Sequence, residues 1–293
     1  MNTRNDRRWL GISFGALAVV AAATVGFAVG DALATPGKVA ATTAGRSASG
    51  TTDFHQTWSL APGKTLEIEG VNGAIHATGT TDKTVEVSAR KHAEHSDPDE
   101  VTIEVLEHAG GITLCVRYPD THGNRNTCEP GGHSHMQLDD NDVAVDFEVR
   151  VPAGVRFVGR TVNGSVEATG LTADAEGHTV NGAVTLVTKG RAEARTVNGA
   201  VRARLGRLGG TGPVSFRTVN GSIVVELPEG VGAEIRAQTL HGGIETDFPV
   251  TVTHVKRRFV GDKLEGTIGK GGVILELETV NGSIRVRKAG GSI

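Results

Sequence analysis

Aromatic side chains are scarce in this chain, since Phe, Trp and Tyr together make up 4% of its 293 residues. A core so poor in large rings has to be thin and filled by Val, Ile, Leu and Ala, which is typical of stacked short strands. Charge of one sign is also lacking, because the formal net charge is −3. This balance excludes a strongly basic nucleic-acid-binding surface, and we predict no nucleic-acid partner.

Two further absences narrow the fold and the chemistry. No helical hydrophobic period of useful length follows residue 35, so an all-β chain is expected. The chain also contains no glycine-rich dinucleotide motif opening a helix and no phosphate loop. We therefore predict no bound cofactor.

What the chain has in abundance is glycine, with 41 residues, and much of it belongs to one repeated tetrapeptide. Thr-Val-Asn-Gly occurs five times, at residues 161–164, 179–182, 196–199, 218–221 and 279–282. Residues 70–73 form an earlier, looser copy, and residues 239–242 form a degenerate one in which His241 replaces Asn. A glycine turn about every 20 residues predicts a single-stranded β-solenoid, of undetermined handedness, with turns of about 20 residues.

The residues before each copy alternate with the same phase. Charged residues such as Glu276 and Glu278 fix one face as the outer one, which leaves Leu277, Thr279 and Asn281 on the inner face. We therefore expect the asparagines to point inward and to bond to one another as a structural ladder along the stack. The ladder residues are Asn163, Asn181, Asn198, Asn220 and Asn281. The glycine after each asparagine is expected to supply a positive φ at the corner.

Stacking the repeats in chain order also aligns two columns on the outer face. The polar column contains Arg160, His178, Arg195, Arg217, Gln238 and Glu278. The apolar column beside it contains Val162, Val180, Val197, Val219, Leu240 and Val280. One hypothesis is that this strip binds a partner, with Arg160, His178, Arg195, Arg217, Val180, Val197 and Val219 as its contact residues. The alternative is that valine simply favours strands and arginine solvates the face.

Two irregular insertions interrupt the first half of the folded region, at residues 91–100 and 119–142. Cys115 and Cys128 lie at the start of the second insertion and within it, and in an exported chain they predict a disulfide rather than two free thiols. The same loop carries His133 and His135, a spacing that metals use. Because no third His or Cys stands at a diagnostic spacing, a solvated loop is the alternative to a metal site.

The N-terminal residues predict export. Three arginines precede an apolar, charge-free run at residues 9–30, followed by small residues. Residues 1–34 therefore form either a cleaved signal peptide or an N-terminal helix that tethers the chain to a membrane. Residues 35–52 are small and polar, as in a flexible linker, and residues 53–290 form the solenoid domain. We expect irregular turns over 53–150 and regular turns over 151–290.

Several of these segments together resemble a known family. The repeated Thr-Val-Asn-Gly, the segment at 149–155 (Val-Arg-Val-Pro-Ala-Gly-Val) and the segment at 247–250 (Asp-Phe-Pro-Val) are similar to the bacterial putative-adhesin family of β-strand-repeat proteins. The resemblance covers roughly residues 55–290. It implies an exported or membrane-tethered β-solenoid in a bacterium, located in the periplasm or at the cell surface, and it supplies no catalytic motif.

We therefore predict a non-enzymatic structural, adhesive or interaction module. Its expected partner is a cell-envelope polymer or a surface protein, with self-association as a further possibility. The first alternative is a module that binds a metal or small ligand in the 119–142 loop. A polysaccharide-active enzyme is the second alternative. The outer column after each glycine contains Glu167, Thr185, Arg202, Val224, Glu245 and Arg285. The enzyme alternative is disfavoured because the two glutamates of this column do not lie on adjacent turns, so they form no catalytic pair of acids.

Overall fold

A computed structural model describes residues 53–120, 125–138, 140–210, 212–257 and 261–290. The predicted export segment at 1–34 and the linker at 35–52 lie outside these residues. Within the described ranges, no helix is long and apolar enough to cross a membrane.

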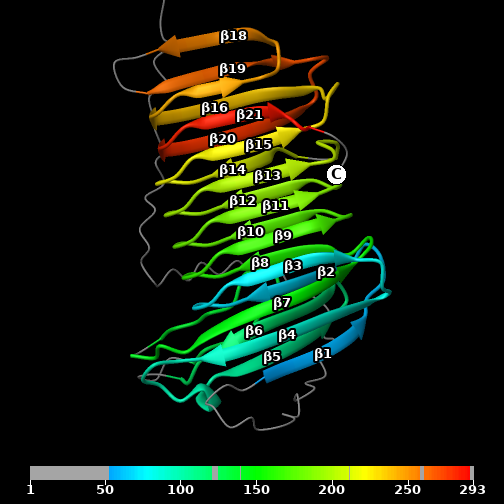
Figure 1. The fold of residues 1–293 in the computed structure, drawn as a ribbon, viewed down its shortest axis with the longest axis vertical. Helices are drawn as coiled ribbons and strands as arrows, with labels where there is room; N and C mark the ends of the chain where they lie inside the picture. Colours follow the sequence, from blue (N-terminus) through cyan, green and yellow to red (C-terminus); the bar gives the residue numbers. More distant parts are fainter. Residues whose placement is uncertain (1–52, 121–124, 139, 211, 258–260, 291–293) are drawn as a thin grey trace, which may run out of the picture. The chain divides into compact units, whose positions relative to one another are not determined.

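The all-β class is confirmed. Apart from one short 3₁₀ turn, η1 (Pro98–Glu100), every regular element in the described part of the chain is a strand. The strands form two mixed sheets (Figure 1). Sheet 1 contains, in spatial order, β1 (Asp53–Ser59), β4 (Thr84–His92), β7 (Ala144–Pro152), β3 (Ile75–Thr80), β9 (Val166–Leu171), β11 (Val184–Thr188), β13 (Val201–Leu205), β15 (Ile223–Leu227), β21 (Ile284–Lys288) and β17 (Ile244–Thr246).

Sheet 2 has eleven strands and faces sheet 1. It contains, in spatial order, β18 (Val250–Arg257), β19 (Asp262–Ile268), β16 (Ala233–His241), β20 (Val273–Asn281), β14 (Val214–Arg217), β12 (Ala192–Arg195), β10 (Ala175–His178), β8 (Arg156–Arg160), β2 (Thr65–Glu69), β6 (Gly111–Arg117) and β5 (Thr102–His108).

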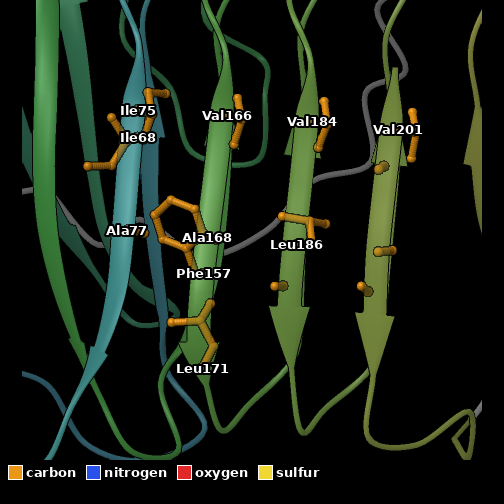
Figure 2. Packing of buried hydrophobic residues seen from close by; sticks show 14 of the residues in the cluster. Ile68, Ile75, Ala77, Phe157, Val166, Ala168, Leu171, Val184, Leu186 and Val201 are labelled. Atoms are coloured by element: carbon orange, nitrogen blue, oxygen red, sulfur yellow. The ribbon is translucent and has the colours of Figure 1, made fainter. Parts of the chain in front are cut away.

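From β8 to β15 the chain alternates between the two sheets, and each strand from β10 on pairs in parallel with the strand two positions earlier. One strand in each sheet therefore makes one turn of a coil, and one Thr-Val-Asn-Gly corner joins the two strands. The alternation seen in the sequence explains the core, because residues two apart on a strand point to the same face. Val166, Val184 and Val201 lie in a row across successive turns (Figure 2).

The space between the sheets is narrow, and small residues set its width. Gly159 and Gly177 pair with each other on β8 and β10 of sheet 2. A Cβ atom at Gly177 would lie 2.5 Å from Val184 Cγ1, and one at Gly159 would lie 2.8 Å from Val166 Cγ1. Both valines belong to sheet 1, so these glycines allow the two sheets to approach. The low aromatic content of the chain follows from this thin core.

Antiparallel strands extend the coil at both ends, a departure from a uniform single-stranded solenoid. In the first half, β4 pairs antiparallel with β1 and β7, and β5 pairs antiparallel with β6. In the second half, β18 and β19 form an antiparallel hairpin that adds to β16. The sequence contains no Thr-Val-Asn-Gly copy inside these segments, so the corner that forces a parallel turn is missing there.

The last turn of the chain is inserted out of sequence order. β20 lies between β14 and β16, and β21 lies between β15 and β17. Asn281 therefore stacks on Asn220, and His241 pairs with Asn281 at the outside of the stack. The expectation that the turns stack in chain order is wrong for the final two copies. In sequence order the turn of β16 and β17 and the β18–β19 hairpin come before β20 and β21, but in the structure β20 and β21 lie between that turn and the turn of β14 and β15.

An amide ladder does run along the corners. Each Asn Nδ2 donates a hydrogen bond of 2.7–2.9 Å to Oδ1 of the asparagine on the next turn, in the order Asn281, Asn220, Asn198, Asn181, Asn163 and Asn72. These asparagines are exposed, except for Asn72, which is half-buried. The prediction that the ladder side chains point into the core is therefore wrong.

The backbone at each corner explains this error. Thr179 N donates to Arg195 O on one neighbouring turn. Val180 N and Asn181 N both donate to Val162 O on the other neighbouring turn. Two consecutive amides that point the same way end the alternation of an extended chain. The threonines are accordingly buried, as the alternation predicts, whereas each asparagine is turned to the outside.

The corner glycines are needed for close approach and not for a positive φ. The glycines of the five full copies all lack the positive φ that we expected of them. A Cβ atom at Gly182 would instead lie 2.0 Å from Gly164 O of the adjacent turn, and the other copies repeat this contact at 1.9–2.0 Å. The same carbonyl accepts a hydrogen bond of 2.8 Å from Thr179 Oγ1. Thr and Gly of the repeat thus hold one backbone carbonyl between successive turns.

We predict that Gly182→Ala destabilises the fold by about 1–3 kcal/mol or more, because the added methyl group meets backbone that has no free space to move into. The matched control is Gly243→Ala, at a corner position with no atom within 4 Å of the added carbon and no positive φ. Urea unfolding of the two variants measures the difference. Equal midpoints would show that the close approach does not constrain the stack.

Candidate functional site

The long insertion is attached to the outer face of sheet 2. The predicted disulfide between Cys115 and Cys128 is confirmed, with the two Cα atoms 5.7 Å apart. Cys115 is on β6, so the bond fixes residues 125–138 beside that strand. A second anchor is the Asp142 carboxylate, which accepts backbone hydrogen bonds from Glu94, His95 and Ser96 of the other insertion. Hydrogen bonding with Ser96, more than with the other two, holds the pKa of Asp142 well below its usual range.

The attached loop covers two glutamates of β2. Glu67 and Glu69 point to the outer face of sheet 2, yet only 4% and 8% of their surfaces are exposed. Glu67 Oε2 accepts hydrogen bonds from Gly131 N at 2.7 Å and from Thr113 Oγ1 at 3.1 Å. Its Oε1 accepts one from Arg160 Nε at 3.1 Å. Burial alone raises the pKa of Glu67, but the hydrogen bonds from Gly131 and Arg160 outweigh it and hold the pKa below its ordinary value.

Glu69 is the less well satisfied of the two. Its Oε1 is buried without a hydrogen-bond partner among the described residues, and Arg160 Nε lies 3.8 Å away. Burial raises the pKa of Glu69 from an ordinary 4.5 to about 7. The negative charge of Glu67 adds to this rise, against a hydrogen bond from Ser134 in the loop. One carboxyl of the pair is therefore held ionised, and the other is protonated in part near neutral pH.

Acid–base catalysis often uses two carboxyls whose pKa values are shifted in opposite directions, but Glu67 and Glu69 are not accessible to a substrate. Three protein donors already occupy the oxygens of Glu67, and the loop excludes solvent from both side chains. A general base needs a free lone pair within hydrogen-bond reach of the substrate. The pair therefore holds the loop in place and has no geometry for turnover.

We predict that Glu69 makes the fold less stable as the pH rises. The pKa of Glu69 is higher in the folded chain than in the unfolded chain, so the protonated carboxyl stabilises the fold. This contribution to the free energy of unfolding is fully present below pH 4.5 and is lost as the pH rises to about 7. The amide of Glu69→Gln stays neutral, so the free energy of unfolding of this variant should fall by about 1–3 kcal/mol less than that of the wild type over the same pH range. Urea unfolding across this pH range tests the effect, with the exposed Glu193→Gln as the control. A wild-type slope in Glu69→Gln would contradict it.

The predicted polar strip is in register, but its charges are largely compensated. The order across the strands is Arg160, His178, Arg195, Arg217, Glu278 and Gln238, with the last two exchanged relative to the sequence prediction by the inserted turn. An acidic column of Glu67, Glu176, Glu193 and Glu276 lies two residues away on the same face.

Individual contacts show this compensation. Arg160 contacts Glu67, and Arg217 contacts Glu276 at 3.0 Å and Glu278 at 3.4 Å. His178 and Arg156 lower the pKa of Glu176 to about 2. The valines of the apolar column, Val180, Val197 and Val219 among them, are half-buried. Arg195 is exposed, and the residues paired with it on the neighbouring strands are His178 and Arg217. Among the described cations of the strip, it is therefore the one that remains available for a partner.

The metal-binding alternative stays a prediction, because residues 121–124 and 139 of the loop lie outside the described residues. His133 and His135 are both exposed, and His135 is bridged through its backbone to Thr127. Among the described residues, no group of three or more His, Cys, Asp or Glu side chains is placed to hold a metal ion.

A cationic patch on the outer face of sheet 1 was not anticipated from the sequence. We call Arg202, Arg204, Arg285 and Arg287 the arginine patch. Arg202 and Arg204 lie on β13, and Arg285 and Arg287 lie on β21, with β15 alone between these strands. Strands two apart in a sheet are separated by about 9.6 Å. The two pairs therefore lie close enough for one ligand to contact both.

Two of the four arginines have acidic partners. Arg204 pairs with Glu226 at 3.6 Å, and Arg285 pairs with Glu245 at 2.9 Å. Arg202 and Arg287 are exposed, and neither makes an ion pair within the described residues. Asp247 follows β17 and accepts a hydrogen bond from Lys288 N, so three acidic residues, Glu226, Glu245 and Asp247, border the four arginines.

The sequence signal for this patch is the repeated Arg-x-Arg that follows two of the corners, at 202–204 and 285–287. In chain order these copies are separated by two further corner copies, so they appear distant. The insertion of β21 beside β15 brings them together. The patch therefore results from the strand order of the folded chain and not from the order of the residues in the sequence.

Comparisons with known proteins find distant structural matches at low identity. No family model and no curated protein matches the chain. A solved structure of a putative cell adhesion protein from Clostridium sporogenes is 11% identical, with a TM-score of 0.43, over 81% of this chain and 100% of that chain. A putative adhesin from Bacteroides fragilis is 10% identical, with a TM-score of 0.28, over 81% and 97%.

A third solved structure, a putative lipid binding protein from Parabacteroides distasonis, is 11% identical, with a TM-score of 0.20, over 81% of this chain and 97% of that chain. These values carry no functional argument. Membership of the putative-adhesin family stays a prediction from the sequence.

Proposed function

We propose that the chain is an exported, non-enzymatic binding module of a bacterial cell envelope, in which a β-solenoid displays the arginine patch to an anionic polymer. In this proposal residues 1–34 direct export or tether the chain, residues 35–52 are a linker and residues 53–290 form the solenoid. The observation that carries it is the pair of exposed arginines, Arg202 and Arg287, that have no ion-pair partner in the described structure.

The chemistry of the patch favours an anionic over a neutral partner. Guanidinium groups bind carboxylate, sulfate and phosphate oxygens through two parallel hydrogen bonds. The patch residues are arginines, with the half-buried Val224 between Arg202 and Arg285, and no aromatic ring that could stack on a sugar belongs to it. A polymer suits the site because each exposed ion pair is weak and several must act together.

The scaffold supports the same role. Parallel strands hold the arginines on a rigid face, so little backbone order has to be gained on binding. The predicted strip on sheet 2 is the competing surface, with Arg195 as its available cation. Its other arginines already contact glutamates.

We predict that Arg202→Glu with Arg287→Glu weakens binding to dextran sulfate about tenfold or more, since two exposed charge reversals remove about 1.4 kcal/mol. Uncharged dextran should not bind, and higher ionic strength should weaken the wild-type interaction. The charge-matched control is Arg90→Glu with Arg236→Glu, because both arginines are exposed and lie outside the patch.

A second double variant, Arg195→Glu with Arg217→Glu, separates the two surfaces. Retained binding in this variant supports the arginine patch. Loss in this variant together with wild-type binding by the patch variant would assign the polymer to sheet 2 and overturn the proposal.

Export is tested separately by intact-mass analysis of the native protein after cell fractionation. We predict a species outside the cytoplasm that becomes two mass units heavier on reduction of Cys115–Cys128. A species that starts near Thr35 indicates a cleaved signal, and a full-length membrane-bound species indicates a tether. A full-length protein in the cytoplasm would contradict export.

A further inference from the structure

The end of the long insertion lies over the two buried glutamates of β2. We call residues 129–134 the tip. Gly131 N of the tip donates a hydrogen bond to Glu67 Oε2 at 2.7 Å. Ser134 of the tip forms a hydrogen bond with Glu69. The tip therefore covers two carboxyls that would face solvent on an uncovered outer face.

The base of the tip is held by contacts that do not involve these glutamates. The Asn126 side chain is buried and donates to three backbone oxygens, one of which belongs to Gln137. Thr127 and His135 exchange two backbone hydrogen bonds, of 2.9 and 3.1 Å. The disulfide ties the same base to β6. The tip can thus move while its base stays attached.

Beneath the tip, three carboxylates share one arginine. Arg160 Nε lies 3.1 Å from Glu67 and 3.8 Å from Glu69, and its Nη2 lies 3.9 Å from Glu176 of β10. Despite burial, hydrogen bonds hold the pKa of Glu67 below its ordinary value, and a hydrogen bond with His178 lowers the pKa of Glu176 to about 2. Ionisation of Glu69 therefore adds a third negative charge around a cation that two anions already contact.

No second cation contacts Glu69 within the described ranges. The other charged groups near this site contact other acids or face solvent: His178 and Arg156 with Glu176, Arg117 with Glu104 and Asp120, and the exposed Glu129 and His133 of the tip. Glu69 Oε1 is buried without a hydrogen-bond partner, and burial raises the pKa of this carboxyl to about 7. Lifting the tip would solvate the carboxylate, so the covered form binds the proton more tightly, and a rise in pH favours the uncovered form.

We propose that the tip is a pH-sensitive latch, which closes over β2 when Glu69 is protonated and lifts from β2 when Glu69 is ionised. The disulfide and the Asn126 side chain keep the base attached, so the opening is local. The open form exposes Glu67, Glu69 and Arg160 together on the outer face of sheet 2. A partner that contacts these side chains is therefore excluded by the closed form. The latch does not depend on the arginine patch.

The test is hydrogen exchange of the oxidised full chain in detergent, measured by rapid mixing and mass spectrometry at pH 5 and pH 8. A comparison of wild type with Glu69→Gln at the same pH cancels the intrinsic exchange rate. At pH 8 the tip of the wild type should exchange about tenfold faster or more, because ionisation of the carboxyl drives opening. At pH 5 the two rates should lie much closer together. The matched control, Glu193→Gln, changes an exposed glutamate on the same face and should exchange like the wild type.

Urea below the unfolding transition separates opening of the tip from unfolding of the whole chain, because the urea dependence scales with the surface exposed. Exchange of the tip should be nearly independent of urea, whereas exchange of β9 and β11 should accelerate. Equal tip rates in wild type and Glu69→Gln at pH 8 overturn the latch, and so does tip exchange that accelerates with urea in step with β9 and β11. If Glu69→Gln does not fold, the wild type alone decides. Protection of its tip, corrected for the intrinsic rate, has to fall between pH 5 and pH 8, and constant protection overturns the proposal.

Discussion

The close approach of successive glycine corners is the constraint on which the rest of this structure depends. Each corner glycine lies so near the carbonyl of the adjacent turn that any side chain there would collide with it. That contact keeps consecutive turns in parallel register, places the asparagine amides within hydrogen-bond distance and fills the core with rows of equivalent side chains. Register errors are disfavoured, because a shift of one residue would exchange the buried and exposed faces.

The same regularity explains why function belongs to the departures from it. A repeated turn offers identical columns of side chains, and on sheet 2 these columns compensate one another as ion pairs. Distinctive chemistry appears where the repeat is interrupted. The disulfide-bonded loop buries Glu67 and Glu69, and the inserted last turn assembles the arginine patch. Each arises from a segment that lacks the tetrapeptide or lies out of chain order.

Glu69 illustrates how the loop changes a residue that would otherwise be ordinary. On an uncovered strand, an outward glutamate is solvated and ionised at neutral pH. Here the loop removes water while Glu67 takes most of the available donors, so the pKa of Glu69 rises to about 7. The alternation of the strand predicted that both glutamates point outward, and only the covering loop decided that they are buried.

The sequence by itself determined the all-β class, the period of the turns, the buried threonines and the disulfide, because these depend on local alternation and on the spacing of residues along the chain. Tertiary structure alone decided the outward turn of the asparagines, the true reason for the corner glycines and the insertion of β20 and β21 between earlier turns. The physical reason is the same in each case. These features depend on which turns of the solenoid are neighbours. Because the repeats are nearly identical in sequence, no local signal determines which repeat packs beside which.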